Sequence, residues 1–280
     1  MRNVAVVGSG TMGNGIAHVF AQFGFSVILL DVQQSYLERA VQTIEKNLQR
    51  QVKKEKITND DAKEILDRIT TSINLEDCSN CELVVEAVTE DYSIKQKVFS
   101  RLNEICDSET IFASNSSSLS MTRLAAGSGR PERFIGMHFM NPVPVMKLVE
   151  VIRGMATSRE TLDTILAVAE KLRKTPVEVQ DYPGFIANRI LMPMINEAIF
   201  SLMEGVAEKE AIDTVMKLGM AHPMGPLELA DFIGLDVCLA ILEVLYNGFK
   251  DPKYRPCPLL VNMVAAGYLG RKTGRGFYSY

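Results

Sequence analysis

The chain has 280 residues, of which 47% are apolar and 23% are charged. This composition is typical of a globular protein that buries a sizeable core, and it excludes a disordered or fibrous chain. The formal net charge is −4 without any block of like charges, and no apolar run approaches the roughly 18 residues that span a bilayer, so neither nucleic acid nor a membrane is an expected partner.

The sequence begins with a predicted strand, residues 3–7, that leads directly into a glycine-rich turn with the pattern GxGxxG. The apolar run is too short for a signal peptide, whose core needs about seven to fifteen residues. In this pattern the first glycine allows a tight turn, the second lets the backbone approach a pyrophosphate, and the third permits close packing of the following helix, whose exposed N–H groups face the phosphates. The segment therefore predicts a dinucleotide site. Its expected contact residues are Gly8, Gly10, Thr11, Met12 and Gly13.

A second predicted strand, residues 26–30, ends at Asp31. A carboxylate at this place accepts hydrogen bonds from a ribose diol and repels a 2′-phosphate. The next residues, Val32-Gln33-Gln34, include no arginine that could hold such a phosphate. The pattern favours NAD over NADP, while FAD stays possible from the glycine fingerprint alone.

About fifty residues separate Asp31 from the next predicted strand, which is too many for a single crossover. Residues 34–56 and 59–69 have charged, amphipathic helical patterns, with Thr58 or Asn59 as the N-cap of the second helix. We expect a helical hairpin over about residues 34–70 that projects from the sheet.

The rest of the first two-thirds alternates helical stretches with short apolar runs, which are typical of parallel strands covered on both faces. These runs are residues 82–88, 110–113, 133–139, 148–152 and 177–179. The alternation predicts an α/β fold, a Rossmann-type doubly wound and mostly parallel sheet. Beyond Tyr182-Pro183-Gly184 the pattern is helical, so we expect a nucleotide-binding domain over residues 1–182 and a smaller all-α domain over residues 183–280.

His138 is the strongest of three histidines as a candidate for chemistry, because it lies at the carboxyl end of a predicted strand, where ligands bind in open α/β sheets. Glu150 follows twelve residues later, after a Pro-rich turn at residues 141–144 that could bring the two side chains together. The alternative is that the two residues are unrelated. His18, inside a predicted helix, and His222, in a Pro/Gly-rich turn, are expected to be structural.

Polar residues 114–118, Ser-Asn-Ser-Ser-Ser, end another strand on the same predicted sheet edge. Most serine runs are loops or helix caps, but this position favours a role at the site. The five cysteines are scattered and odd in number, which favours a reducing cytoplasm over a disulfide framework. The lone pair Cys78 and Cys81 lacks the partners of a metal site and precedes a strand, so neither metal nor redox use is expected.

Four segments carry a family resemblance that covers essentially the whole chain. They are residues 114–150, residues 181–189 (Asp-Tyr-Pro-Gly-Phe-Ile-Ala-Asn-Arg), residues 223–236 beginning Pro-Met-Gly-Pro, and the tail at residues 272–278. These segments resemble the L-3-hydroxyacyl-CoA dehydrogenases, particularly the bacterial 3-hydroxybutyryl-CoA dehydrogenases. The one mild departure is Ser116, where many relatives have threonine.

The resemblance implies an NAD-dependent oxidoreductase that interconverts short-chain (S)-3-hydroxyacyl-CoA and 3-oxoacyl-CoA. His138 matches the family's general base, and Glu150 matches the carboxylate that holds its ring. Ser117 and Asn188 match side chains that hydrogen-bond the C3 oxygen of the substrate. Since Asn188 belongs to the second domain, the resemblance implies a site in a cleft that domain closure completes.

Further residues match positions that contact the cofactor in the family. They are Ser117, Asn141, Glu90, Lys95 and Lys272. The helical insertion matches the part of the family that contacts coenzyme A, and Lys53, Lys54 and Lys56 would suit its phosphates; the alternative is a solvated helix face. A homodimer formed through the second domain is also implied. The methionines expected in its core and subunit interface are Met192, Met194, Met203, Met216 and Met220.

Two alternatives stay open. One is a related NAD-dependent dehydrogenase of a free hydroxy acid, of the gulonate type. The other is a non-catalytic NAD-binding protein, like the crystallins recruited from this family, and the intact set of His138, Glu150, Ser117 and Asn188 argues against it.

Overall fold

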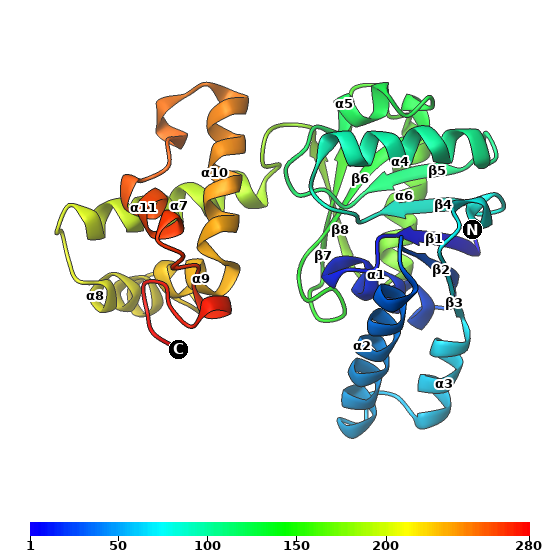
Figure 1. Ribbon diagram of the computed structural model, residues 1–280, viewed down its shortest axis with the longest axis horizontal. Coiled ribbons are helices and arrows are strands. Elements are labelled where there is room, and N and C mark those ends of the chain that lie inside the picture. The colour runs from blue at the N-terminus through cyan, green and yellow to red at the C-terminus, as the bar shows by residue number, and fades with distance from the viewer. The chain divides into compact units, whose positions relative to one another are not determined.

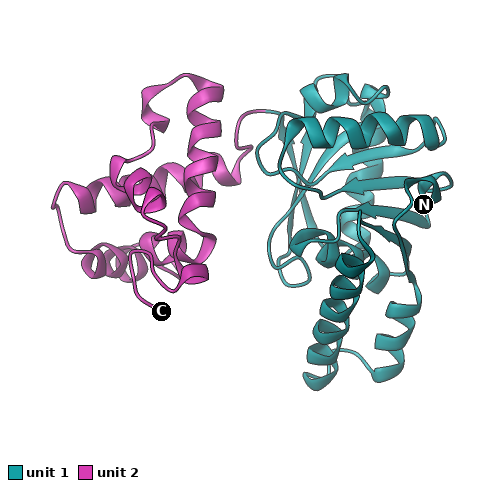
Figure 2. Cartoon of the chain, in the orientation of Figure 1, with its two compact units in different colours: residues 1–181 teal, residues 182–280 magenta.

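The computed structural model describes all 280 residues as two compact units, residues 1–181 and residues 182–280 (Figure 2). The first unit is α/β and the second is helical, which confirms the predicted fold class. The domain boundary predicted from the sequence lies after residue 182. No helix combines the length and the apolar character that crossing a membrane requires.

An eight-stranded sheet forms the centre of the first unit, in the order β3-β2-β1-β4-β5-β6-β7-β8 (Figure 1). Its strands are β1 (Asn3–Val7), β2 (Ser26–Leu30), β3 (Ile69–Ser72), β4 (Leu83–Glu86), β5 (Ile111–Ser114), β6 (Phe134–Phe139), β7 (Leu148–Arg153) and β8 (Thr175–Gln180). All neighbours are parallel except β6 and β7, which are antiparallel. The central strands β4 and β5 are buried along their whole length, as their continuous apolar runs indicate.

Helices cover both faces of this sheet (Figure 1). The helices of this unit are α1 (Thr11–Gln22), α2 (Gln34–Lys53), α3 (Asn59–Asp67), α4 (Tyr92–Ile105), α5 (Met121–Ala126) and α6 (Arg159–Lys171), with short 3₁₀ turns at Leu75–Cys78 and Pro131–Arg133. The helices α1 and α6 contribute Ile16 and Ile165 to one core with strand residues such as Ile135. On the opposite face, Phe99 of α4 packs edge-on against Phe134, with ring centroids 4.7 Å apart. Residues 134 and 135 point to opposite faces because side chains alternate along a strand.

The inserted segment forms the predicted helical hairpin, which extends away from the sheet (Figure 1). Thr58 caps α3 through a reciprocal pair of hydrogen bonds with Asp61, which confirms one of the two predicted caps. The sequence missed β3, because the helix predicted to residue 69 ends at Asp67 and Ile69–Ser72 pairs with β2. This edge strand is short, polar and only partly covered, so it lacks the apolar run on which a strand prediction depends.

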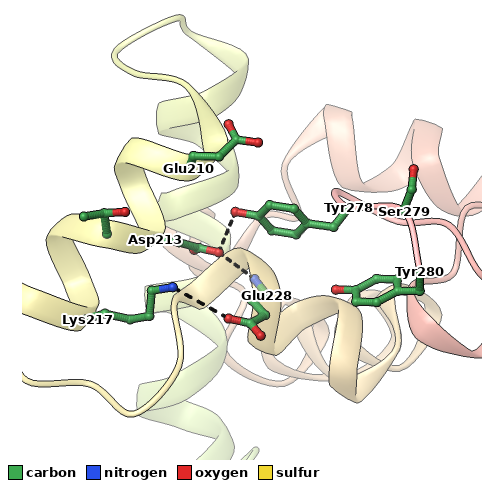
Figure 3. Close-up of a pocket in the computed structure, with 8 residues that line it drawn as sticks. Glu210, Asp213, Lys217, Glu228, Tyr278, Ser279 and Tyr280 are labelled. Carbon is green, nitrogen blue, oxygen red and sulfur yellow. Dashed lines mark hydrogen bonds and ion pairs between the residues drawn. The ribbon is translucent and has the colours of Figure 1, made fainter.

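The second unit is an independent bundle of helices around its own apolar core. The helices are α7 (Ala187–Met203), α8 (Lys209–Thr214), α9 (Pro226–Ile233), α10 (Leu235–Phe249) and α11 (Pro258–Ala265), with a π turn at Val215–Gly219 and 3₁₀ turns at Pro252–Tyr254 and Arg271–Thr273. Buried Asp213 accepts hydrogen bonds from the N–H of Glu228 and the hydroxyl of Tyr278 (Figure 3). It also accepts the N–H of Leu227. Asp231 accepts the N–H groups of Phe277 and Tyr278, both at 2.9 Å. The two carboxylates therefore fasten the C-terminal tail to α8 and α9.

His18 lies fully buried in α1, as expected for a structural histidine, with its Nε2 atom 3.2 Å from the side-chain nitrogen of Gln51 in α2. Burial disfavours the charged ring and lowers the pKa of His18 to about 4, although a hydrogen bond with Gln22 opposes the shift. The imidazole is consequently neutral at physiological pH.

Acid is expected to destabilise the first unit through His18. The unfolded ring titrates near 6.5, so the unfolded chain binds more protons than the folded chain between pH 6.5 and about 4, and stability falls as the pH drops through that window. Urea unfolding at pH 7 and pH 4.5 should show an acid loss that is smaller in His18→Gln than in the wild type by about 2 kcal/mol. His222→Gln, which changes a loop histidine of the second unit, should keep the wild-type loss. Equal losses in wild type and His18→Gln would contradict the assignment.

Candidate functional site

The carboxyl ends of β1, β4, β5 and β6 lie along one edge of the sheet, because these four strands are parallel neighbours. The glycine-rich turn follows β1, Glu90 follows β4, the serine run follows β5, and His138 lies near the end of β6. In open α/β sheets this edge is where ligands bind. The structure thus brings the site residues predicted in the first unit to one edge of the sheet, apart from those of the helical insertion.

The glycine-rich turn is closely packed at two positions and open at the third. Gly8 has a φ of +101°, and its N–H donates to the carbonyl of Leu30 at 2.8 Å. A side-chain carbon at Gly13 would lie 1.7 Å from the carbonyl oxygen of Gly8, so α1 can begin this close to the turn only with glycine there. At Gly10, by contrast, no atom lies within 4 Å of the place that a side-chain carbon would take. The turn therefore offers the open backbone that a pyrophosphate requires.

Asp31 is held at the end of β2 by hydrogen bonds to its carboxylate from the N–H and hydroxyl of Ser9, at 2.7 and 2.6 Å, and from the N–H of Val32 at 2.7 Å. A pocket of about 300 Å³ lies beside it, lined by the glycine turn, Asp31 and the α2 residues Tyr36 and Arg39. The open turn and the anchored carboxylate fit the pyrophosphate and ribose of a dinucleotide.

Arg39 was not predicted as a residue near the 2′-phosphate position, because only the three residues after Asp31 were considered for that role. Its Nε donates to the carbonyl of Ser35, and its guanidinium lies 4.8 Å from the centroid of the Tyr36 ring. In the helix predicted from residue 34, Ser35 and Arg39 lie one turn apart on the same face. The predicted helix could therefore have indicated that Arg39 lies close to Asp31.

His138 and Glu150 face each other across the antiparallel pair β6 and β7. The ring Nδ1 lies 2.7 Å from a carboxylate oxygen of Glu150, and both residues are buried. A buried carboxylate at hydrogen-bond distance orients the imidazole ring. The predicted contact between the two side chains is present in the structure.

Two further side chains fix the segments around His138: Asn115, which belongs to the polar run 114–118, and Lys174, which the sequence did not single out. Asn115 accepts the N–H of Phe139 at 2.9 Å, which ties the serine run to the end of β6. The Lys174 ammonium donates to the carbonyls of Val143 and Met146 at 2.5 and 2.7 Å, and so holds the turn that contains the exposed Asn141. No sequence signal separates Lys174 from a solvated lysine.

Lys95, which was expected to contact the cofactor, lies buried in α4 with its ammonium 2.5 Å from a carboxylate oxygen of Glu86 and 3.3 Å from one of Glu90. Glu86 was also missed. Glu86 ends the apolar run Leu83-Val84-Val85, so the sequence could have indicated that it is buried. A buried acid needs a cation or several hydrogen-bond donors nearby.

The remaining predicted residues lie outside this edge or in the second unit. Lys54 is exposed at the C-cap of α2, and Lys46, Arg50 and Lys53 line a shallow groove on the same helix. In the second unit Asn188 is buried in the first turn of α7. The ammonium of Lys272 pairs with Asp236, at 2.5 and 2.6 Å from its two oxygens.

The five cysteine thiols are free and buried. Burial raises the pKa of Cys81 and of Cys106 to about 11, so both thiols stay protonated and unreactive at neutral pH. No group of three or more His, Cys, Asp or Glu side chains is placed to hold a metal ion.

Comparison with known proteins gives one consistent family. Residues 3–182 match the family model of the 3-hydroxyacyl-CoA dehydrogenase NAD binding domain, and residues 184–280 match that of the C-terminal domain. The 3-hydroxybutyryl-CoA dehydrogenase of Bradyrhizobium diazoefficiens is 55% identical over 280 residues, which cover 100% of this chain and 96% of that protein. The enzyme of the same name from Clostridioides difficile is 50% identical, over 99% of each chain. The crystal structure of (S)-3-hydroxybutyryl-CoA dehydrogenase PaaH1 from Ralstonia eutropha superimposes with a TM-score of 0.98 at 52% identity, over 100% of this chain and 99% of that one.

Replacing Asp31 by Ala should narrow the preference for NAD over NADP. The change removes the carboxylate that repels a 2′-phosphate and leaves Arg39 in the same pocket as a cation that can attract one. The ratio of kcat/KM for NADH and NADPH should fall by at least about tenfold, which corresponds to about 1.4 kcal/mol of lost discrimination. Ser9→Ala, which removes one hydrogen bond to the carboxylate but keeps its charge, is the control and should retain the preference. An unchanged ratio in Asp31→Ala would show that discrimination lies elsewhere.

Proposed function

Because the chain belongs to the 3-hydroxyacyl-CoA dehydrogenase family, we propose that His138, braced by Glu150, is the general base of its reaction. The protein is an NAD-dependent oxidoreductase of the 3-hydroxybutyryl-CoA dehydrogenase type, which interconverts (S)-3-hydroxybutyryl-CoA and acetoacetyl-CoA. The single observation that supports the assignment of the base is the 2.7 Å contact between the buried imidazole and the carboxylate at the ligand-binding edge of the sheet.

Oxidation of the secondary alcohol requires removal of the hydroxyl proton while a hydride leaves the same carbon. With Nδ1 held by Glu150, Nε2 of His138 is the atom that takes this proton. The carboxylate stabilises the imidazolium that forms, and in the reverse direction the same imidazolium returns the proton to the oxygen. Both residues are buried, which strengthens their interaction relative to water.

Bound NAD⁺ accepts the hydride in oxidation, and bound NADH supplies it in reduction. Our proposal places the dinucleotide on the glycine-rich turn with its ribose at Asp31, and the observations that support it are the open backbone at Gly10 and the anchored carboxylate. Glu90, Asn141 and Lys272 are proposed as further cofactor contacts. These roles follow from the family resemblance of each position.

Ser117 and Asn188 are proposed to hydrogen-bond the C3 oxygen of the substrate. A donor at this oxygen stabilises the charge that develops on it when its proton moves to or from the imidazole. Ser117 is also proposed as a cofactor contact. The position of Ser117 next to the end of β5, on the edge that carries His138, supports its part in the proposal.

The coenzyme A portion of the substrate is proposed to lie against the helical insertion, with Lys54 as one contact. The support is the run of basic residues toward the end of α2, where Lys46, Arg50 and Lys53 line one groove, since ammonium and guanidinium groups are the side chains that bind phosphates.

A homodimer formed through the second unit and a cytoplasmic location complete the proposal. An apolar groove of about 460 Å³, lined in part by Met194 and Met216, and exposed apolar residues such as Leu218 and Met220 support a subunit interface in this unit. Met192, by contrast, is buried in the core. The free thiols support a reducing compartment.

His138→Gln should lower kcat by at least about 10²-fold while the dissociation constant of NADH changes little, since general-base catalysis contributes typically 10²- to 10⁴-fold. Steady-state reduction of acetoacetyl-CoA and NADH fluorescence titration measure the two quantities. His222→Gln is the matched control and should keep wild-type turnover. Near-normal turnover of His138→Gln would refute the assignment of the base.

The substrate class is tested by comparing acetoacetyl-CoA with free acetoacetate. If α2 contacts coenzyme A, the kcat/KM for the thioester should exceed that for the free acid by at least about 10³-fold, because binding energy from the remote part of a substrate contributes to turnover. Equal values would favour a dehydrogenase of a free hydroxy acid. Tight NADH binding without turnover of either compound would favour a non-catalytic NAD-binding protein.

A further inference from the structure

Three charged side chains, Glu86, Lys95 and Glu90, form a connected network beneath the serine run at the end of β5. The side chains of Glu86 and Lys95 are 0% and 1% exposed, whereas that of Glu90 is 38% exposed. A fully buried ion pair is costly unless every charge and hydrogen-bonding group has a partner. The hydrogen-bond partners of these three side chains show which segment of the chain the network holds in place.

The ammonium of Lys95 has all its acceptors inside the protein. Its Nζ lies 2.5 Å from Glu86 Oε1, 3.3 Å from Glu90 Oε2 and 3.3 Å from the carbonyl oxygen of Val88. An ammonium group has three hydrogens, so these three acceptors account for its donors. A ligand that contacted the Lys95 ammonium would therefore have to displace one of these three acceptors.

Glu90 gathers the serine run around a single carboxylate oxygen. Its Oε1 accepts the hydroxyl of Ser116 at 2.5 Å, the N–H of Ser117 at 3.0 Å, and both the N–H and the hydroxyl of Ser118 at 3.1 and 2.9 Å. Burial raises the pKa of Glu90, but the Lys95 charge and the hydroxyl donors outweigh that effect and hold the pKa below its ordinary value. The carboxylate is thus charged at neutral pH and binds the backbone on each side of the Ser117 side chain.

Glu86 holds the same segment from the other end. Its Oε2 accepts the hydroxyl of Ser114 at 2.7 Å, and the hydroxyl oxygen of Ser114 accepts the N–H of Ser116 at 3.2 Å. One ammonium, that of Lys95, consequently pairs with the two carboxyl groups that together fix residues 114–118.

We propose that Lys95, Glu86 and Glu90 act together as positioning residues that set the place of Ser117 at the cofactor and substrate site. The inference rests on the proposed function, in which Ser117 touches both ligands. A short polar side chain on a loop is useful in catalysis only when its backbone is held still, because a displacement of about 1 Å in a reacting geometry can cost about 10²-fold in rate.

The experiment is a double-mutant cycle between Glu90→Gln and Ser117→Ala in the full-length protein, with kcat for acetoacetyl-CoA as the readout. Glu90→Gln keeps the size of the side chain and an acceptor oxygen but removes the charge that Lys95 neutralises. Glu104→Gln, which neutralises an exposed glutamate of helix α4 that pairs with Arg101, is the matched control. Hydrogen exchange of the peptide that spans residues 111–121 is measured in each variant.

A positioning role predicts that Glu90→Gln lowers kcat about tenfold in the wild-type background and less than about twofold in the Ser117→Ala background. Exchange of the amides at 116–119 should be faster in Glu90→Gln than in the wild type and unchanged in Glu104→Gln. Lys95→Met, where it folds, should show the same faster exchange.

Two results would overturn the inference. One is the same fold-loss of kcat in both backgrounds, and the other is unchanged amide exchange at residues 116–119 in Glu90→Gln. If Ser117→Ala itself leaves kcat unchanged, the role of Ser117 in the proposed function fails. The exchange of the serine run then still decides whether Glu90 positions it, since that readout needs no turnover.

Discussion

The reversal of strand direction between β6 and β7 is the constraint on which the candidate site depends. A parallel neighbour of β6 would require a crossover of about a dozen residues or more and would place another carboxyl end beside His138. The antiparallel return instead places Glu150 directly opposite His138, so a histidine at the ligand-binding edge acquires a buried carboxylate at 2.7 Å. The Lys174 ammonium secures the intervening turn through two of its carbonyls.

Carboxylates that accept several hydrogen bonds have a similar role elsewhere in the molecule. Removing a carboxylate from water is unfavourable unless donors replace the lost hydration, so each one binds together the segments that supply its donors. Asp31 joins the end of β2 to the glycine-rich turn, and Glu86 and Glu90 join the segments after β4 and β5. In the second unit Asp213 and Asp231 fasten the tail. In each of these loops, hydrogen bonds to a carboxylate hold the backbone in place in addition to the turns themselves.

This arrangement suits hydride-transfer chemistry. An oxidoreductase of the 3-hydroxyacyl-CoA dehydrogenase family must hold a dinucleotide and a base at one place. The glycine-rich turn follows β1, and His138 lies near the end of β6. Because both strands run in the same direction in one sheet, the topology of the first unit alone places the turn and the histidine on one edge. The sheet supplies the placement, and the carboxylates supply the rigidity.

The sequence by itself determined the elements and residues that local pattern encodes: the glycine fingerprint between a strand and a helix, the apolar runs of the buried strands, the helical insertion and the all-α second part of the chain. It also indicated that His138 and Glu150 could lie close together, because only a short turn separates their strands. It missed β3, whose polar edge carries no apolar period. Only the tertiary structure decided which groups neutralise the buried charges. Glu86 meets Ser114 and Glu90 meets Ser116 across 28 and 26 residues of sequence, and Lys95 is buried between two acids where a lysine is ordinarily solvated. Such partners depend on how the sheet aligns distant strand ends, and no local period in the chain records that alignment.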